Sequence, residues 1–166
     1  MHTTINLDHF IRTHVTKRPE SLLSADLGKN QDLLTERLNG KSILVIGGAG
    51  TIGSHYIKAI LKFNVNRLVV VDINENGLTE LVRDLRSSTG YNIPGDFITY
   101  PMNFGDKVFG KIFRSMAPFD IVANFAAHKH VRSEKDIFSI EAMIENNVLR
   151  AQQLLELLLQ YPPRSE

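Results

Sequence analysis

Residues 42–53 read SILVIGGAGTIG, an apolar run that leads directly into three glycines spaced three residues apart, Gly47, Gly50 and Gly53. The uninterrupted apolar run over residues 42–46 is typical of a parallel strand that is buried on both faces. The following residues, 52–63, have helical spacing, so the glycines lie in a strand-to-helix turn. The first glycine permits the tight bend, the second lets the backbone approach phosphate oxygens, and the third lets the helix pack closely on the strand.

The start of the predicted helix presents a positive partial charge to a phosphate group. The first backbone N–H groups of a helix, here around Thr51 to Gly53, have no partner within the helix, and the helix dipole reinforces their positive end. We therefore expect a nucleotide pyrophosphate at this turn.

The rest of the chain alternates strands with helices. Apolar runs predict strands over residues 67–72, 97–100 and 120–124, and apolar stripes predict helices capped by Asn74, over 105–116 and over 139–160. Strands that alternate with helices in this way form a parallel sheet with right-handed crossovers. The predicted fold class is α/β, a Rossmann-type doubly wound parallel sheet.

An acidic residue ends the second predicted strand. Asp72 lies 19 residues beyond Gly53, where a carboxylate accepts hydrogen bonds from the adenosine ribose of a dinucleotide. That carboxylate repels a 2′-phosphate, and residues 73–82 contain no Arg or Lys to offset the repulsion. The pattern predicts a dinucleotide site that prefers NAD over NADP. The alternative is that Asp72 only caps the end of a strand.

The first forty residues differ in character from the remainder. Residues 6–15 and 31–38 have helical spacing, Pro19 separates the two stretches, and Asn39-Gly40 is a good helix stop. We expect an N-terminal helical arm over residues 1–40 and an NAD(P)-binding domain over residues 41–166.

The composition excludes several classes of function. The chain has 166 residues, 43% of them hydrophobic and 22% charged, which is typical of a globular protein. The net charge of +1 gives no electrostatic footprint for nucleic acid. No apolar run is long enough to span a membrane, and the polar start has no signal-peptide core. The absence of cysteine fits a reducing compartment, so we expect a cytoplasmic protein.

Two segments carry a resemblance to a known family. Residues 47–54, GGAGTIGS, resemble the glycine loop of the extended short-chain dehydrogenase/reductases. Residues 124–131, NFAAHKHV, are similar to the HAAALKHVP stretch of their polysaccharide-biosynthesis branch, which contains the UDP-N-acetylglucosamine 4,6-dehydratases and nucleotide-sugar epimerases. The pairs Glu141-Ala142 and Asn147-Val148 fall where that branch has EA and NV. The resemblance extends from about residue 18 to residue 160.

The resemblance implies a role for individual residues. It implies that the pyrophosphate is held by Gly47, Gly50, Thr51, Ile52 and Gly53, and the adenosine ribose by Asp72, Ile73 and Asn74. It implies that Asn103, in place of the usual Asp, contacts the adenine beside Phe104, and that Ala126 and Ala127 lie beside the cofactor. Lys129 and His130 then face the cofactor or a nucleotide-sugar substrate. The chain departs from the branch at Asn124-Phe125, usually HA, and at Arg150, usually Gly.

The catalytic pair of the family is missing from the chain. Its members use a Tyr with a Lys four residues later, and none of the four tyrosines here has one. The resemblance implies that this pair follows a further strand, so we expect the N-terminal part of a longer enzyme, not active alone. A dehydratase of this branch transfers a hydride from C4 of the sugar to the nicotinamide, eliminates water across C5 and C6, and returns the hydride at C6, whereas an epimerase shares only the first step. The alternative is a naturally short, non-catalytic nucleotide-binding, redox-sensing or oligomerising module.

Two further features of the sequence bear on metal binding and on association. His128, His130 and Glu134 are too few to form a convincing zinc site, so we predict no metal. The last predicted helix carries a core stripe at Ile144, Val148, Ala151, Leu155 and Leu158, and further leucines make its second half apolar nearly all round. That surplus predicts either packing against a further part of the enzyme or a homo-oligomer interface through this helix.

Overall fold

The computed structural model describes residues 6–18, 20–129 and 136–163. Its contacts divide the chain into two compact units, Met1–Arg37 and Leu38–Glu166. Each unit is described by itself.

Short helices make up the first unit. They are α1 (Leu7–Phe10), the π-helix η1 (Ile11–Thr16), α2 (Ser24–Lys29) and α3 (Gln31–Leu38), whose last residue belongs to the second unit. The side chain of Asn6 accepts a hydrogen bond from the backbone N–H of His9, as expected of a helix-capping residue. Helix α2 was not predicted from the sequence.

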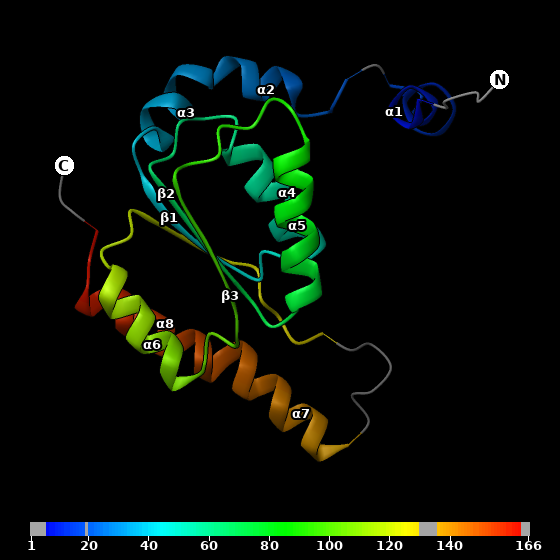
Figure 1. Ribbon diagram of the computed structural model, residues 1–166. Helices are drawn as coiled ribbons and strands as arrows, with labels where there is room; N and C mark the ends of the chain where they lie inside the picture. The colour runs from blue at the N-terminus through cyan, green and yellow to red at the C-terminus, as the bar shows by residue number, and fades with distance from the viewer. Residues whose placement is uncertain (1–5, 19, 130–135, 164–166) are drawn as a thin grey trace. The chain divides into compact units, whose positions relative to one another are not determined.

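A four-stranded parallel sheet forms the centre of the second unit (Figure 1). Its strands are β1 (Ser42–Ile46), β2 (Arg67–Asp72), β3 (Asp96–Pro101) and β4 (Ile121–Asn124), in the order β3-β2-β1-β4. Ile46 pairs with both Val71 and Asn124, so three strands have their carboxyl ends at the same end of the sheet. The predicted α/β class and parallel topology are confirmed.

Helices cover both faces of this sheet. They are α4 (Thr51–Ile60), α5 (Glu75–Ser87), α6 (Lys107–Met116), and the long final helix, which comprises α7 (Ile137–Ile144), the π-helix η2 (Glu145–Leu149) and α8 (Arg150–Gln160). Figure 1 shows α4 and α5 on one side of the sheet and α6 with α8 on the other. Among the described residues, none of these helices is long and apolar enough to cross a membrane.

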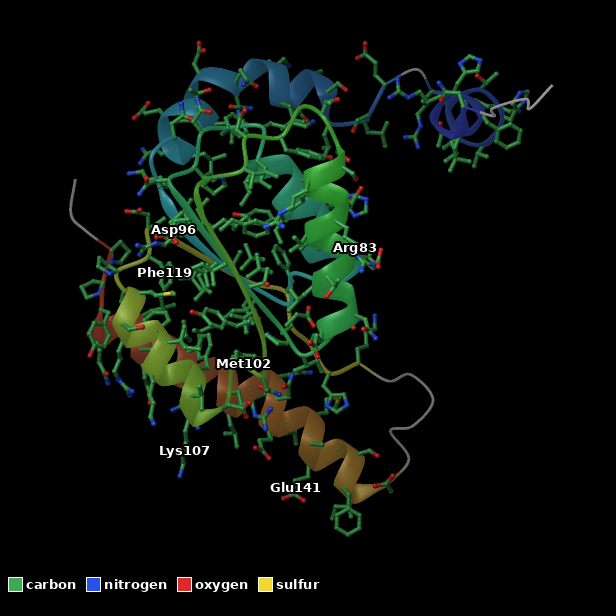
Figure 2. All side chains as sticks on the ribbon, in the orientation of Figure 1. Arg83, Asp96, Met102, Lys107, Phe119 and Glu141 are labelled. Atoms are coloured by element: carbon green, nitrogen blue, oxygen red, sulfur yellow. The ribbon has the colours of Figure 1, made fainter. Side chains whose placement is uncertain are left out.

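The core between the sheet and α6 is rich in phenylalanine. Phe109 and Phe113 of α6 and Phe119, which precedes β4, are each no more than 2% exposed (Figure 2). They pack in one cluster with Leu154 of α8 and with alternate residues of the two central strands, Leu44, Ile46, Val69 and Val71. Side chains alternate between the two faces of a strand, so their neighbours Ile43, Val45, Leu68 and Val70 turn toward the opposite face and are buried as well.

The core stripe predicted for the final helix is confirmed only in part. Leu158 packs on the core, but Ile144, Val148 and Leu155 are between 48% and 60% exposed. Leu154, which was not in the predicted stripe, is buried at 5%. The inward face of this helix includes Asn146 and Arg150, which line a cleft instead of an apolar core, so no continuous apolar stripe follows that face.

Candidate functional site

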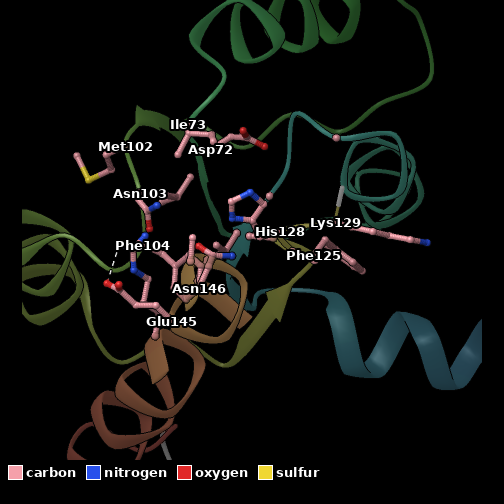
Figure 3. A pocket seen from close by; sticks show the side chains of 18 residues that line it. Asp72, Ile73, Met102, Asn103, Phe104, Phe125, His128, Lys129, Glu145 and Asn146 are labelled. Atoms are coloured by element: carbon pink, nitrogen blue, oxygen red, sulfur yellow. Dashed lines mark hydrogen bonds and ion pairs between the residues drawn. The ribbon is translucent and has the colours of Figure 1, made fainter. Parts of the chain in front are cut away.

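A cleft of about 560 Å³ opens at the carboxyl ends of the strands (Figure 3). The carboxyl ends of the strands are where α/β sheets of this kind bind their ligands. Nine of the residues singled out from the sequence line it, namely Gly47, Gly50, Asp72, Ile73, Asn103, Phe104, Ala126, Ala127 and Lys129. They come from the turns that follow all four strands, so residues up to 82 positions apart in the sequence meet around one space.

Gly47 begins the turn that follows β1. Its φ angle is +76°, a conformation that side chains with a Cβ rarely adopt. A Cβ added here would lie 2.5 Å from the backbone nitrogen of Ala126, so the turns after β1 and β4 touch through their backbones. The backbone N–H of Gly47 donates to the carbonyl of Val71 at 2.7 Å, which fastens the turn to β2. Only glycine fits this position.

The amino end of α4 faces the same turn. Gly50 is its N-cap residue, and no side chain caps the helix there. A Cβ on Gly50 would meet only the carbonyl oxygen of Gly47, at 3.4 Å, so a ligand can approach this backbone. A Cβ on Gly53 would lie 2.2 Å from that same oxygen, which shows why the helix packs so closely on the turn. The first amides of α4 are therefore left for an anion.

Asp72 links the glycine turn to the end of β2. One carboxylate oxygen accepts the backbone N–H of Ala49 at 2.9 Å, and the other accepts that of Asn74 at the same distance. Each oxygen keeps a second lone pair, so the carboxylate can still accept a hydroxyl donor. Two backbone bonds hold the carboxylate in one orientation beside the cleft.

A tight turn after β3 carries Asn103 and Phe104. The side-chain oxygen of Asn103 accepts the N–H of Gly105 at 2.9 Å, and its carbonyl accepts the N–H of Asp106 at 3.0 Å. Phe104 is 7% exposed and anchors the turn in the core below. The side-chain oxygen of Asn103 thus already accepts one hydrogen bond within its own turn.

The described part of the loop after β4, residues 125–129, is held at two points. Phe125 donates its N–H to the carbonyl of Ile46, and Asn124 accepts the N–H of Ala126 at 3.0 Å. Farther along, the side chain of Asn147 in η2 accepts the N–H of His128 at 2.8 Å and donates to its carbonyl at 3.0 Å. These bonds fix the small residues Ala126 and Ala127 against the cleft.

An aromatic pair supports the outer side of this loop. The ring of Tyr56 on α4 lies 5.1 Å from that of Phe125, measured between centroids. Burial raises the pKa of the Tyr56 hydroxyl above its ordinary value. Tyr56 therefore stays protonated near neutral pH and packs as an aromatic residue, which is not the behaviour of a general base.

The final helix supplies cleft residues that sequence reasoning missed. Glu145, Asn146 and Arg150 line the cleft, and the guanidinium of Arg150 lies 3.2 Å from the carboxylate of Glu145. A dashed line marks this ion pair in Figure 3. The available signal was their helical spacing: Asn146 and Arg150 stand eight and four residues before the buried Leu154.

Some of the residues singled out from the sequence do not line the cleft. Thr51, Ile52 and Gly53 begin α4 beside it, and the Ile52 side chain is 72% exposed. Asn74 caps α5, where its side chain accepts the N–H of Gly77 at 2.9 Å.

Other expectations fall at the loop beyond β4. Lys129 is exposed, and Figure 3 shows its side chain extending away from Asn103 and Glu145. His130 and Glu134 lie outside the described residues, so the expected substrate contact and the metal prediction stay predictions.

Comparison with known proteins places most of the chain in one family. The sequence profile of the polysaccharide biosynthesis protein family matches residues 43–162. An uncharacterized membrane protein of Methanocaldococcus jannaschii is 36% identical over 120 residues, which cover 72% of this chain and 32% of that protein. The dTDP-glucose 4,6-dehydratase of Salmonella typhimurium is 32% identical over 120 residues, covering 72% of this chain and 31% of the dehydratase.

A solved structure agrees with these sequence matches. The Bordetella bronchiseptica enzyme WbmF, solved in complex with NAD⁺, is 26% identical with a TM-score of 0.54. The match covers 75% of this chain and 34% of WbmF. The chain thus spans about a third of the length of these similar proteins. By the profile match and by these relatives, the chain belongs to the polysaccharide biosynthesis protein family.

Proposed function

We propose that this chain forms the dinucleotide-binding part of a nucleotide-sugar 4,6-dehydratase or epimerase of surface-polysaccharide biosynthesis. One observation carries the proposal: the uncapped amino end of α4 and the carboxylate of Asp72 face the same cleft. An anion site beside a fixed hydroxyl acceptor matches the pyrophosphate and ribose of a dinucleotide. The similarity to a dTDP-glucose 4,6-dehydratase and to an enzyme that binds NAD⁺ supports the choice of reaction class.

The chemistry of the cleft residues suits the pyrophosphate and the adenosine ribose of NAD. Gly50 opens to the cleft, so its backbone leaves room at the turn for the pyrophosphate, and Gly47 lets this turn lie directly against the backbone of Ala126. The amides of Thr51, Ile52 and Gly53 would hold its oxygens. Asp72, Ile73 and the backbone around Asn74 would hold the adenosine ribose.

The other end of the site would receive the reactive part of the cofactor. Ala126 and Ala127 are small, so their loop leaves space for the nicotinamide ribose beside β4. A bound nicotinamide supplies reversible acceptance of a hydride from the sugar. The chain's own residues bind and orient, with Lys129 and His130 proposed to face the nucleotide sugar. The tyrosine–lysine pair of the reaction is not among the residues of this chain.

We further propose that NAD is preferred over NADP. The Asp72 carboxylate repels a 2′-phosphate, and no Arg or Lys follows it before residue 83. The absence of cysteine supports a cytoplasmic location for the enzyme.

Calorimetric titration of the chain with NAD⁺ and with NADP⁺ tests this function. We expect saturable binding of NAD⁺ and at least tenfold weaker binding of NADP⁺, because two like charges would meet at the ribose. Absence of heat with both dinucleotides, from a folded sample, would contradict the proposal and favour a module that does not bind nucleotides. Equal affinity for the two would contradict only the preference.

A further inference from the structure

The π-helical turn of the final helix places two charged residues on the same side. A π-helix is built on i to i+5 hydrogen bonds, and Glu145 and Arg150 are five residues apart across η2. The guanidinium Nη2 of Arg150 lies 3.2 Å from Oε1 of Glu145, and both residues line the cleft. π-helical turns are rare and occur frequently at functional sites. Glu145 therefore holds the guanidinium of Arg150 at the cleft.

A second contact fixes the stem of Arg150. A Cβ built on Gly105, in the turn after β3, would lie 2.3 Å from Cδ and 2.6 Å from Nε of Arg150. The arginine side chain thus crosses the backbone at Gly105, where a larger residue would displace it. Its side chain is 26% exposed, so part of the guanidinium remains accessible to a ligand.

The strand order tells which part of a dinucleotide would lie beside Arg150. The glycine turn follows β1, Asp72 ends β2, and the turn with Asn103 follows β3, which lies at the edge of the sheet. Going from β1 toward β3 across the carboxyl ends of the strands, a bound dinucleotide would present its pyrophosphate, then its adenosine ribose, and last its base. Arg150 packs on the turn after β3, so it lies at the end that receives the base.

We propose that Arg150 binds the adenine of the dinucleotide, with its planar guanidinium packed against the face of the ring. A guanidinium stacks on aromatic faces more readily than an ammonium group does, because it is planar and weakly hydrated. Glu145 and Gly105 already restrict the side chain, so little freedom is lost when the base binds. The inference rests on the proposed function, since it assumes that a dinucleotide occupies the cleft.

The experiment measures dissociation constants for NAD⁺ and for nicotinamide cytosine dinucleotide, whose smaller base offers less surface to the guanidinium. The wild-type chain, Arg150→Met, Arg150→Lys and the control Arg83→Met are compared. Arg83 lies on α5 with a side chain that is 71% exposed, and it is not among the residues that line the cleft (Figure 2). We expect Arg150→Met to weaken NAD⁺ binding about tenfold and the cytosine analogue less than about threefold. We expect Arg83→Met to bind both like the wild type.

Each other outcome has one meaning. If Arg150→Met binds NAD⁺ like the wild type, or weakens both dinucleotides by the same factor, Arg150 does not bind the base and the inference is wrong. If Arg150→Met does not fold, Arg150→Lys decides, because it keeps the charge and loses the plane, and the same base-dependent loss is expected. If the wild type binds neither dinucleotide, the proposed function fails before any variant is compared.

Discussion

Asp72 combines a structural and a proposed recognition role in one carboxylate. Its oxygens accept the N–H groups of Ala49 and Asn74, and the residue lines the cleft. The position was predictable because acid, strand and glycine turn follow a fixed spacing in the sequence. The two backbone bonds were not predictable, since they depend on how the turns after β1 and β2 meet in space.

We expect Asp72→Ala to weaken NAD⁺ binding about tenfold, because the ribose hydroxyls lose their hydrogen-bond acceptor. NADP⁺ binding should stay nearly unchanged, because the loss of this acceptor is offset by the loss of repulsion between the carboxylate and the 2′-phosphate. Calorimetric titration of the wild type and of Asp72→Ala with each dinucleotide checks this. Asp72→Asn removes the charge and leaves a single acceptor oxygen, so it keeps at most one of the two backbone bonds, because the amide NH2 group cannot accept an N–H. An equal loss for the two dinucleotides would show that Asp72 does not contact the ribose.

Gly47 offers a stability prediction at the same scale. Gly47→Ala combines a φ of +76° with a Cβ 2.5 Å from the Ala126 nitrogen, so we expect it to lower the free energy of unfolding by about 2 kcal/mol or more. Urea denaturation measures this change. Gly95→Ala is the matched control, because a Cβ there meets nothing within 4 Å, and its stability should stay within about 0.5 kcal/mol of the wild type.

At the scale of elements, the strands were predictable and the final helix was not fully so. The bounds predicted for β1 and β2 are those observed, because both strands are buried on two faces and read as uninterrupted apolar runs. The final helix was predicted as a regular helix over residues 139–160, and the π-helical turn η2 was missed. Its inward face changes from polar beside the cleft to apolar beside α6, a change set by tertiary position rather than by local pattern.

We expect Asn147→Ala to free the loop after β4. The variant removes the bonds to the N–H and the carbonyl of His128, so amide hydrogen exchange at His128 and Lys129 should become faster. The free energy of unfolding should fall by about 1 kcal/mol, the usual net value of such bonds. Gln152→Ala is the control because Gln152 is exposed on the same helix and pairs only with Glu156 among the described contacts. Unchanged exchange at His128 would show that the two bonds do not hold the loop.

At the scale of the whole molecule, the second unit leaves an apolar surface uncovered. Ile137, Phe138, Leu155 and Leu159 of the final helix are between 60% and 83% exposed. The surplus of leucines was visible in the sequence, whereas the face that remains exposed was not, because the predicted core stripe included Leu155, which is exposed. An exposed apolar surface of this kind favours association.

We expect the isolated chain to self-associate through this helix face. Light scattering at increasing protein concentration should give a mass above that of one chain, and the double variant Leu155→Glu, Leu159→Glu should restore the mass of a monomer. Val108→Glu, on an exposed position of α6, should leave the mass of the wild type unchanged. A wild-type chain that stays monomeric at all concentrations would contradict the prediction.

The π-helical turn η2 also makes the final helix tolerant of the loss of one residue. Its hydrogen bonds run from residue i to residue i+5, so the turn holds one residue more than an α-helical turn with i to i+4 bonds. Removing one residue from 147–149 would let this turn close as an ordinary α-helix, and the helix on either side of it would keep its orientation. Arg150 and Leu154 would then still face the cleft and the core, whereas a deletion in α8 would turn the residues beyond it by about 100°.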